Sequence, residues 1–436
     1  ISILVMSKPY VVVSCPIDTF SGYGARARDL VKALMNSEKY DVKILSQRWG
    51  NTPYGFLKED NKDEKKMIDA IIPPPLQRQP DVWIQISVPD EFQKVGKFNI
   101  GITAGIETDL CDVRFIQGAN NMDLVLGSSN HSLLALKQSQ YEQKDKSGKV
   151  VGNIKLTTPT DVLFEGVDLE KYFHIEPKDL PKTELVESLD TIEEKFCFLY
   201  VGHWLRGAIG EDRKNTGLML KIFLETFKGQ KNPPALIMKT MTGPASIMDR
   251  EEVLRKINEV RNGVGGKLPN VYLVHGDIDD TDVNNLYNHP KVKAMINLTK
   301  GEGFGRPLLE FTQSKKPIIA SNWSGHLDFL KAEFASLVPG EVKPVHESVV
   351  QERLILKESK WFQFEIGFAQ LLMKDYVNSY KMYAEKGKRL GYYCKTNFSF
   401  EKMQEKLETI MDANAPKKVE IKLPNIKKIT LPKKND

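Results

Sequence analysis

The chain has 436 residues, of which 41% are hydrophobic, and a formal net charge of +5. This length predicts two domains, and the apolar fraction fits a soluble globular protein and excludes a disordered chain. No apolar run approaches the roughly 18–20 residues that span a bilayer, so we expect no transmembrane segment and a cytoplasmic location.

In the first part of the chain, short β-branched or apolar runs alternate with longer amphipathic stretches. This is the pattern of βαβ units around a parallel sheet. The expected strands are residues 10–14, 42–45, 82–86, 99–102, 124–127 and 160–164. An expected helix over residues 25–35 places Leu30, Val31 and Leu34 on one face. We therefore expect a first Rossmann-like domain over residues 1–175.

A stretch rich in acidic residues and prolines, residues 176–195, breaks this pattern and predicts a linker. The alternation then resumes, so residues 196–375 are expected to form a second Rossmann-like domain. Its expected strands are 196–201, 235–238, 271–274, 294–297 and 317–320, and its expected helices are 218–227, 251–260 and 308–314. Ligands of such sheets bind beyond the carboxyl ends of the strands, which here predicts a cleft between two doubly wound domains.

The end of the chain is expected to be helical and then basic. We expect a long helical region over residues 361–389 and a further helix over 399–411, with residues 376–412 returning to the first domain. The tail, residues 413–436, holds seven of the 62 basic residues but only two of the 57 acidic ones, so the remainder is electrically balanced. Such a tail can contact nucleic acid or an anionic membrane, or it can be a solvated chain end.

Cysteine and histidine spacing argues against a metal site. The four cysteines lie far apart without a CxxC pair, and the seven histidines form no HxxxH or HExxH pattern. We expect buried free thiols in a reducing compartment, no disulfide framework and no bound metal.

The strongest candidate for chemistry is the segment 297–310, where a strand ends, a glycine-rich loop follows and a proline stands at the start of a helix. Gly303 and Gly305 let the backbone approach a ligand, and the free N–H groups of the helix start suit a diphosphate. The carboxylates of Glu302 and Glu310 suit sugar hydroxyls. The alternative is that both glutamates only complement the helix dipole.

These two glutamates and the intervening Gly-Phe-Gly-x-Pro resemble the E-x7-E signature of family-four glycosyltransferases, relatives of sucrose and glycogen synthases. Five further segments match motifs of that family in the same order. They are the glycine loop 21–24, Glu-Gly-Val-Asp at 165–168, residues 198–202 with Arg213-Lys214, the strand and loop 271–277, and residues 317–325. The resemblance implies the GT-B fold, in which two Rossmann-like domains face a cleft and C-terminal helices cross back.

The resemblance also implies roles for individual residues. Glu310 would bind the ribose of a nucleotide sugar, Glu302 would approach the transferred sugar, and Lys214 would neutralise the diphosphate as it leaves. The implied activity is transfer from a nucleotide sugar, with a UDP-sugar favoured, with retention of configuration and without metal or other cofactor. The other donor-binding residues would be Gly22, Gly24, Arg213, Gly276, Gly303, Phe304, Gly305, Arg306, Pro307 and Leu308.

Two departures from the family pattern leave roles open. The arginine that follows the second-domain glycine in the family is His203 here, and Arg206 or Arg213 would supply the missing charge. The family's first-domain histidine has no clear counterpart. Glu107 or Asp109 would take its place near the sugar and acceptor, unless these carboxylates only cap a turn.

Two other motifs point to different chemistry but fit it less well. A G-x-G-x-x-A string at residues 22–27 matches a dinucleotide fingerprint, yet residues 16–21 separate it from the preceding strand, which that fingerprint follows directly. The DxD strings at residues 277–279 and 280–282 resemble metal-binding motifs of the other glycosyltransferase fold. A loop or a helix cap explains them more simply.

The acceptor is less well defined by the sequence. Arg26, in the first turns of the first helix, can meet a phosphate or pair with neighbouring acids. Residues 89–109 resemble glycosyltransferases of large tailed phages, and some phage glycosyltransferases decorate hydroxymethylated pyrimidines in DNA. We therefore expect such a DNA base as acceptor, contacted through the cleft and the basic tail. The alternatives are a polysaccharide or lipid acceptor, or an inactive relative that only binds nucleic acid. The oligomeric state stays open.

Overall fold

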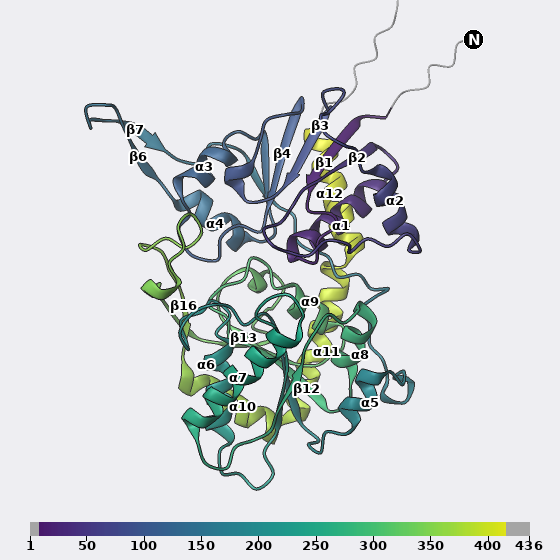
Figure 1. The fold of residues 1–436 in the computed structure, drawn as a ribbon, viewed down its shortest axis with the longest axis vertical. Coiled ribbons are helices and arrows are strands. Elements are labelled where there is room, and N and C mark those ends of the chain that lie inside the picture. Colours follow the sequence, from purple (N-terminus) through teal and green to yellow (C-terminus); the bar gives the residue numbers. More distant parts are fainter. Residues whose placement is uncertain (1–7, 416–436) are drawn as a thin grey trace, which may run out of the picture.

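The computed structural model describes residues 8–415 as two α/β halves, each built on a six-stranded parallel sheet (Figure 1). The predicted α/β class with two doubly wound sheets is confirmed. Within the described residues, no helix is both long enough and apolar enough to span a bilayer. Most of the predicted basic tail, residues 416–436, lies outside the described residues.

The sheet of the first half has the strand order β2-β1-β3-β4-β5-β8, and all its pairings are parallel. Its strands are β1 (Tyr10–Cys15), β2 (Asp41–Ser46), β3 (Val82–Ile86), β4 (Phe98–Thr103), β5 (Leu124–Gly127) and β8 (Thr160–Val162). β1 and β3 are buried along their whole length, which is typical of parallel strands covered on both faces. The strands predicted for this half are confirmed to within two residues at each end.

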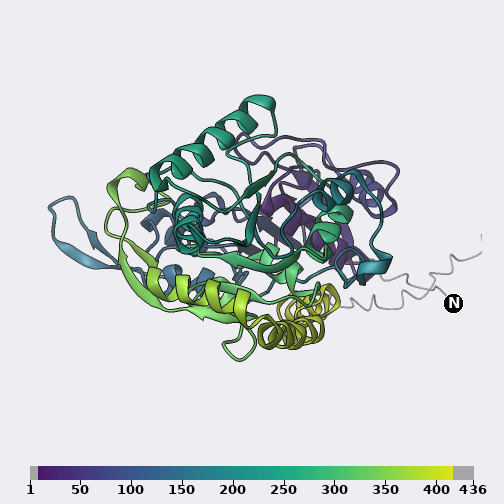
Figure 2. The same cartoon turned by 90° about the horizontal axis from the view of Figure 1, so that it is seen from below.

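Helices flank this sheet, and a hairpin projects from one flank (Figures 1 and 2). The hydroxyl of Ser21 accepts a hydrogen bond from Gly24 N (2.9 Å) and caps the first helix, which starts earlier than predicted. The elements are α1 (Gly22–Asn36), α2 (Lys62–Ala70), η1 (Pro89–Glu91), α3 (Val113–Ala119), α4 (Asn130–Gln138) and the hairpin of β6 (Tyr141–Lys144) and β7 (Val150–Ile154). The three helices after α1 were not predicted, because each is short and carries few apolar residues in a helical period.

The sheet of the second half has the order β11-β10-β9-β12-β13-β14, again parallel throughout. Its strands are β9 (Cys197–Val201), β10 (Ala235–Lys239), β11 (Val271–Val274), β12 (Val292–Asn297), β13 (Ile318–Ser321) and β14 (Ser336–Val338). The helices of this half up to β14 are η2 (Pro177–Asp179), α5 (Glu184–Asp190), α6 (Thr216–Phe227), α7 (Ile247–Val264), α8 (Asp280–Asn288), α9 (Arg306–Thr312) and η3 (Gly325–Asp328). The predicted linker 176–195 thus contains a helix, α5, which Thr183 caps.

The predicted helical region 361–389 is wrong at its start. Residues Lys360–Phe364 form strand β16, which pairs antiparallel with β15 (Gly340–Pro344). This run is rich in aromatic residues, and such side chains pack well on a pleated surface. Helices begin only at Ile366, and they are α10 (Ile366–Asn378), α11 (Tyr380–Asn397) and α12 (Phe400–Asn414).

The chain passes between the halves at two adjacent places. Val167 N donates to Phe398 O (2.9 Å) and Phe400 N donates to Val167 O (2.8 Å), so the outgoing and returning segments pair with each other. Gly166 is needed at this crossing, because a Cβ atom there would lie 2.6 Å from the Cα of Phe400. Beyond the crossing, α12 packs on α1 and places Met403 in the core of the first half (Figure 1).

An arm formed by residues 340–364 extends from the second half to the first (Figure 1). It consists of β15, η4 (Glu347–Val349) and β16. Asp109 N donates to Lys360 O (3.0 Å), and Lys360 N donates to the Asp109 carboxylate (2.6 Å). Arg353 Nε lies 3.1 Å from a carboxylate oxygen of the mostly buried Asp90. The arm therefore ties the two halves together beside the cleft.

We expect Arg353→Ala to loosen the arm, because Asp90 would keep its burial and lose its cation. Amide hydrogen exchange of residues 347–360 should accelerate about fivefold, which corresponds to a loss of roughly 1 kcal/mol in the free energy of local opening. The loss is small because Arg353 is partly exposed and solvent weakens its ion pair with Asp90. Exchange in β1 and β3 should not change. Arg114→Ala is the control, because its pair with the exposed Glu352 is 3.8 Å long. Equal exchange in wild type and Arg353→Ala would contradict the clamping role.

Candidate active site

The loop between β12 and α9 is shaped by a glycine and anchored by apolar side chains. Gly305 has φ +94° directly before α9, a conformation that glycine adopts without strain. Pro307 lies in the first turn of that helix, as predicted. Phe304 and Leu308, both predicted donor contacts, are buried in the core of the second half and hold the loop down.

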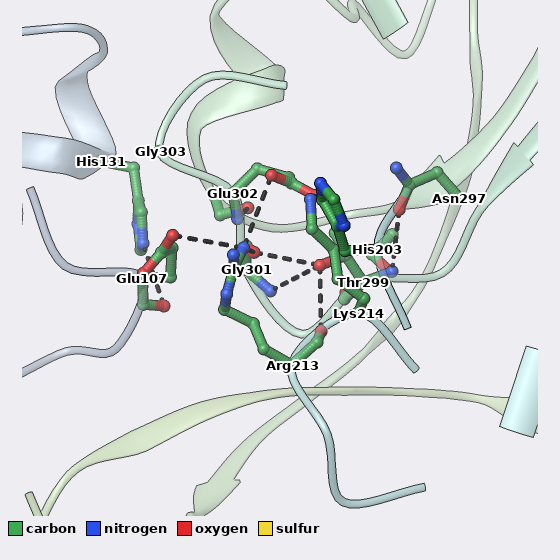
Figure 3. A network of polar contacts seen from close by, with 12 residues as sticks. Glu107, His131, His203, Arg213, Lys214, Asn297, Thr299, Gly301, Glu302 and Gly303 are labelled. Carbon is green, nitrogen blue, oxygen red and sulfur yellow. Dashed lines mark hydrogen bonds and ion pairs between the residues drawn. The ribbon is translucent and has the colours of Figure 1, made fainter. Parts of the chain in front are cut away.

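Glu302 lies between the cations of Lys214 and Arg213 (Figure 3). Its Oε1 is 2.5 Å from Lys214 Nζ, and its Oε2 is 3.6 Å from Arg213 Nη1. The same Arg213 nitrogen lies 3.2 Å from a carboxylate oxygen of Glu107, which belongs to the first half. Burial acts to raise the pKa of Glu302, but the two cations outweigh it and hold that pKa below its usual range. Of the two arginines predicted to supply the missing charge, Arg213 is the one that lies beside Glu302.

The loop that carries these cations is bonded to the glycine-rich loop. Lys300 N and the hydroxyl of Thr299 both donate to Arg213 O, at 2.7 and 3.0 Å. Asn215 adopts a left-handed conformation with φ 54°, and its amide donates to Leu298 O (2.9 Å). The two loops therefore form one unit, in which the position of Lys214 and that of Glu302 are fixed together.

The two halves touch at glycines of this unit. A Cβ atom on Gly303 would lie 2.7 Å from Ala104 O, and one on Gly301 would lie 2.5 Å from Glu107 O. The hydroxyl of Ser129 donates to Gly303 O (2.5 Å) across the same contact. Gly303 was predicted to make room for a ligand, and in this structure the backbone of the first half occupies that room.

A cavity of about 190 Å³ lies between the start of α1 and the start of α9. Glu107 and Glu302 face it from opposite halves, and Tyr23 and Thr103 close it on the side of the first half. Its size and its carboxylates suit a single sugar ring. The predicted residues among its lining are Gly22, Arg26, Glu107, Glu302, Gly303, Phe304, Gly305, Arg306 and Pro307.

Arg306 joins the halves next to this cavity through three carboxylates. Its Nη1 lies 2.5 Å from Asp29 Oδ2 and 3.8 Å from Glu165 Oε2, both in the first half. Its Nε lies 2.9 Å from Oε1 of Glu310, one turn along α9. Burial raises the pKa of Glu310 to about 7, although the Arg306 guanidinium acts to lower it. Because three carboxylates share the guanidinium of Arg306, this cation does not offset the effect of burial on the pKa of Glu310.

The remaining predicted residues have structural surroundings. Arg26 is buried and donates to Phe164 O (2.9 Å) and Leu163 O rather than standing free for a phosphate. Asp109 binds the arm, as described above, and lines none of the described cavities. Gly24 packs on Thr19, whose carbonyl oxygen would lie 2.4 Å from an added Cβ.

The loop after β11 contains both the predicted base contact and the DxD strings. Gly276 has φ +107°, and its carbonyl oxygen accepts a hydrogen bond from Lys239 Nζ (3.3 Å). Asp279 caps α8 by accepting from Asp282 N (2.8 Å), and Asp280 pairs with Lys171 (2.7 Å). Among the described residues, no group of three or more His, Cys, Asp or Glu side chains is placed to hold a metal ion.

Several residues of the site were missed in the sequence. Asp29 carries no signal beyond its place on α1, and Ser128 and Ser129 lie directly before a helix that was not predicted. Glu165 lies in the segment 165–168, which was noted only as a match to a family motif. Their partners lie more than a hundred residues away, so no local pattern marks them.

No family model matches the chain, and no curated protein matches it. Solved structures do match. The sucrose-phosphate synthase of Thermosynechococcus elongatus aligns with a TM-score of 0.59 at 13% identity, over 93% of this chain and 98% of that one. A glycosyltransferase from Rickettsia africae aligns with a TM-score of 0.60 at 14% identity, over 93% of this chain and 98% of that one. HepE of Anabaena, in complex with UDP and glucose, aligns with a TM-score of 0.57 at 13% identity, over 93% of this chain and 100% of that one. The GT-B fold that the resemblance implied is confirmed.

The raised pKa of Glu310 predicts a measurable pH effect. The folded state keeps Glu310 protonated up to about pH 7, whereas an ordinary glutamate ionises near 4.5, so stability from this group is lost as pH rises through 7. Glu310→Gln should therefore raise Tm by about 2 °C or more at pH 8 and leave it unchanged at pH 4. Thermal unfolding at both pH values measures this, with the exposed Glu333→Gln as control. A lower Tm at pH 8 would contradict the assignment.

Proposed function

We propose that the chain transfers a sugar from a nucleoside diphosphate sugar to an acceptor hydroxyl, with retention of anomeric configuration and with a UDP-sugar favoured. The observation that carries this proposal is the grouping of Glu302, Lys214 and Arg213 at the bottom of the cleft of a GT-B fold. The Anabaena structure holds UDP and glucose, which supports a UDP-sugar as the donor to test first.

The cations suit the departure of a nucleoside diphosphate. As the bond between the anomeric carbon and the phosphate oxygen breaks, the electron pair stays with the phosphate, and negative charge builds up there. Lys214 and Arg213 are held in place before the reaction, so they stabilise this charge without reorganisation. Lys214 also touches Glu302, and therefore links the leaving group to the sugar site.

The acceptor hydroxyl completes the exchange on the same face of the sugar. Its oxygen forms the new bond to the anomeric carbon, and its proton passes to the phosphate oxygen that leaves. The sugar becomes oxocarbenium-like in between, as in glycoside hydrolysis. Glu302 remains ionised and accepts hydrogen bonds from sugar hydroxyls, while Glu310 accepts them from the ribose. No metal or other cofactor takes part in this proposal.

The acceptor favoured by the sequence, a hydroxymethylated pyrimidine in DNA, stays part of the proposal. It rests on the resemblance of residues 89–109 to phage glycosyltransferases and on the basic tail, whose residues 416–436 lie outside the described part of the chain. Truncation before residue 416 distinguishes this proposal from the alternative, in which the chain is an inactive relative that only binds nucleic acid. Under that alternative, truncation abolishes DNA binding and the full chain hydrolyses no nucleotide sugar.

Donor choice is tested by thermal shift with UDP-, GDP-, ADP- and TDP-glucose. A ligand present at 100 times its Kd stabilises the folded state by about 2.7 kcal/mol, which raises Tm by several degrees. We expect the largest rise with UDP-glucose. No shift with any of the four would contradict the proposed enzyme.

The role of Glu302 is tested by Glu302→Ala and by the milder Glu302→Gln. Both should lower donor turnover by about 100-fold or more, because an interaction made in the transition state is lost. UDP affinity, measured by calorimetry, should fall by less than about tenfold, since Lys214 and Arg213 remain. The exposed Glu333→Ala is the matched control and should turn over like wild type. Unchanged turnover in Glu302→Gln would rule out the assigned role.

A further inference from the structure

A groove of about 640 Å³ opens on the side of the cleft where the arm crosses between the halves. The first half contributes one wall and the second half contributes the other. This volume is within the range that holds a small-molecule ligand. Its lining includes Tyr23, Trp49 and Glu107 of the first half and Arg206, Arg213 and Trp361 of the second.

The groove adjoins the proposed sugar site. Tyr23, Ala104 and Glu107 line both the groove and the smaller cavity that contains Glu302. Arg213 lines the groove and pairs with Glu107 (3.2 Å) and Glu302 (3.6 Å), so it bridges the two spaces. A molecule in the groove therefore reaches the sugar site past Glu107.

One wall of the groove is a stack of two aromatic rings. Trp49, on the loop after β2, lies against Tyr23 with ring centroids 4.0 Å apart and planes 23° apart. The hydroxyl of Tyr23 shares a hydrogen bond with Thr103 Oγ1 (3.1 Å) and accepts one from Ala104 N (3.0 Å). The ring of Trp49 is thus backed by a ring whose hydroxyl is held by two hydrogen bonds. A flat wall of this kind suits stacking with another ring.

The arm forms another part of the groove lining, and five of its seven lining residues are apolar. Trp361 is buried there and packs in one cluster with Val349 and Ile355. Phe362 N donates to Lys300 O (3.1 Å), which fixes this end of the arm to the glycine-rich loop. The arm therefore builds a groove wall as well as tying the halves together.

Arg206 supplies a cation without a partner. Among the ion pairs of residues 8–415, Arg213 is matched by two carboxylates, whereas Arg206 takes part in none. Arg206 is exposed on the loop 204–212, which is held at its start by the buried Trp204, whose N–H donates to Met241 O (2.8 Å). A guanidinium in this state suits a phosphate, which it binds in a bidentate manner.

We propose that this groove is the acceptor site and that the acceptor is a nucleotide, free or within a single strand. Its base would stack on Trp49, its phosphate would bind Arg206, and its hydroxyl would reach the sugar site past Glu107. The inference rests on the proposed function, because the group that attacks the anomeric carbon is the hydroxyl placed by this groove.

The experiment measures binding by calorimetry in the presence of saturating UDP. The probes are 5-hydroxymethyl-dCMP, a 12-mer single-stranded oligonucleotide with one 5-hydroxymethylcytosine, and glucose 6-phosphate. Trp49→Ala and Arg206→Ala should each weaken binding of the nucleotide probes by about tenfold or more. Trp49→Phe should restore most of the affinity. UDP affinity should match wild type in all three variants, because the ion pairs of Glu302, Lys214 and Arg213 involve neither Trp49 nor Arg206.

The matched control is Arg48→Ala, since Arg48 is an exposed neighbour of Trp49 that does not line the groove. It should bind the probes like wild type. Tighter binding of the oligonucleotide than of 5-hydroxymethyl-dCMP identifies a strand as the source of the nucleotide, and the reverse identifies a free nucleotide. Binding of glucose 6-phosphate alone overturns the inference.

The inference and the proposed function fail in different ways. A wild-type protein that binds no UDP-sugar contradicts the proposed function. Intact UDP binding, combined with nucleotide affinities that Trp49→Ala and Arg206→Ala leave unchanged, contradicts the groove assignment alone. A loss of UDP affinity in Arg206→Ala would also overturn it, because Arg206 would then belong to the donor site.

Discussion

The rest of the structure depends on a direct contact between the main chains of its two halves. At Gly301 and Gly303 a single methyl group would collide with backbone atoms of the first half. Glu302 stands between these glycines, so its position relative to the opposite wall is set by backbone contact and not by adjustable side chains. Lys214 and Arg213 are bonded to the same loop and share this register. A site assembled from two walls gains its precision from such a contact.

The two glutamates of the glycine-rich segment stand in opposite electrostatic surroundings. Glu302 pairs with Lys214 and shares Arg213 with Glu107, and its pKa falls in spite of burial. Glu310 shares Arg306 with Asp29 and another acid, and its pKa rises. Two residues of one type, eight positions apart, thereby have pKa values shifted in opposite directions. The difference comes from the number of cations per carboxylate, since both side chains are buried.

The fold was largely predictable, because a buried parallel strand such as β1 or β3 carries its signal in a few adjacent residues. The glycine-rich segment was found for the same reason. The contacts within the site were not predictable. Arg306 and Asp29 are 277 residues apart, and an acidic residue on a helix carries no sign of a distant arginine. The helix predicted at the end of the arm was wrong for another reason. An aromatic run such as Trp361–Phe364 buries equally well in a helix or a strand, and only its pairing partner decides.

The return of α12 to the first half has a consequence for biosynthesis. Phe400, Met403 and Leu407 complete a core whose other members lie in the opening strands and helices of the chain. A ribosome releases the first sheet long before it releases these residues, and domains that emerge early ordinarily fold first. Here the first half must wait with an open apolar surface until the second half has been made. The half that begins the chain is thus the last to be finished.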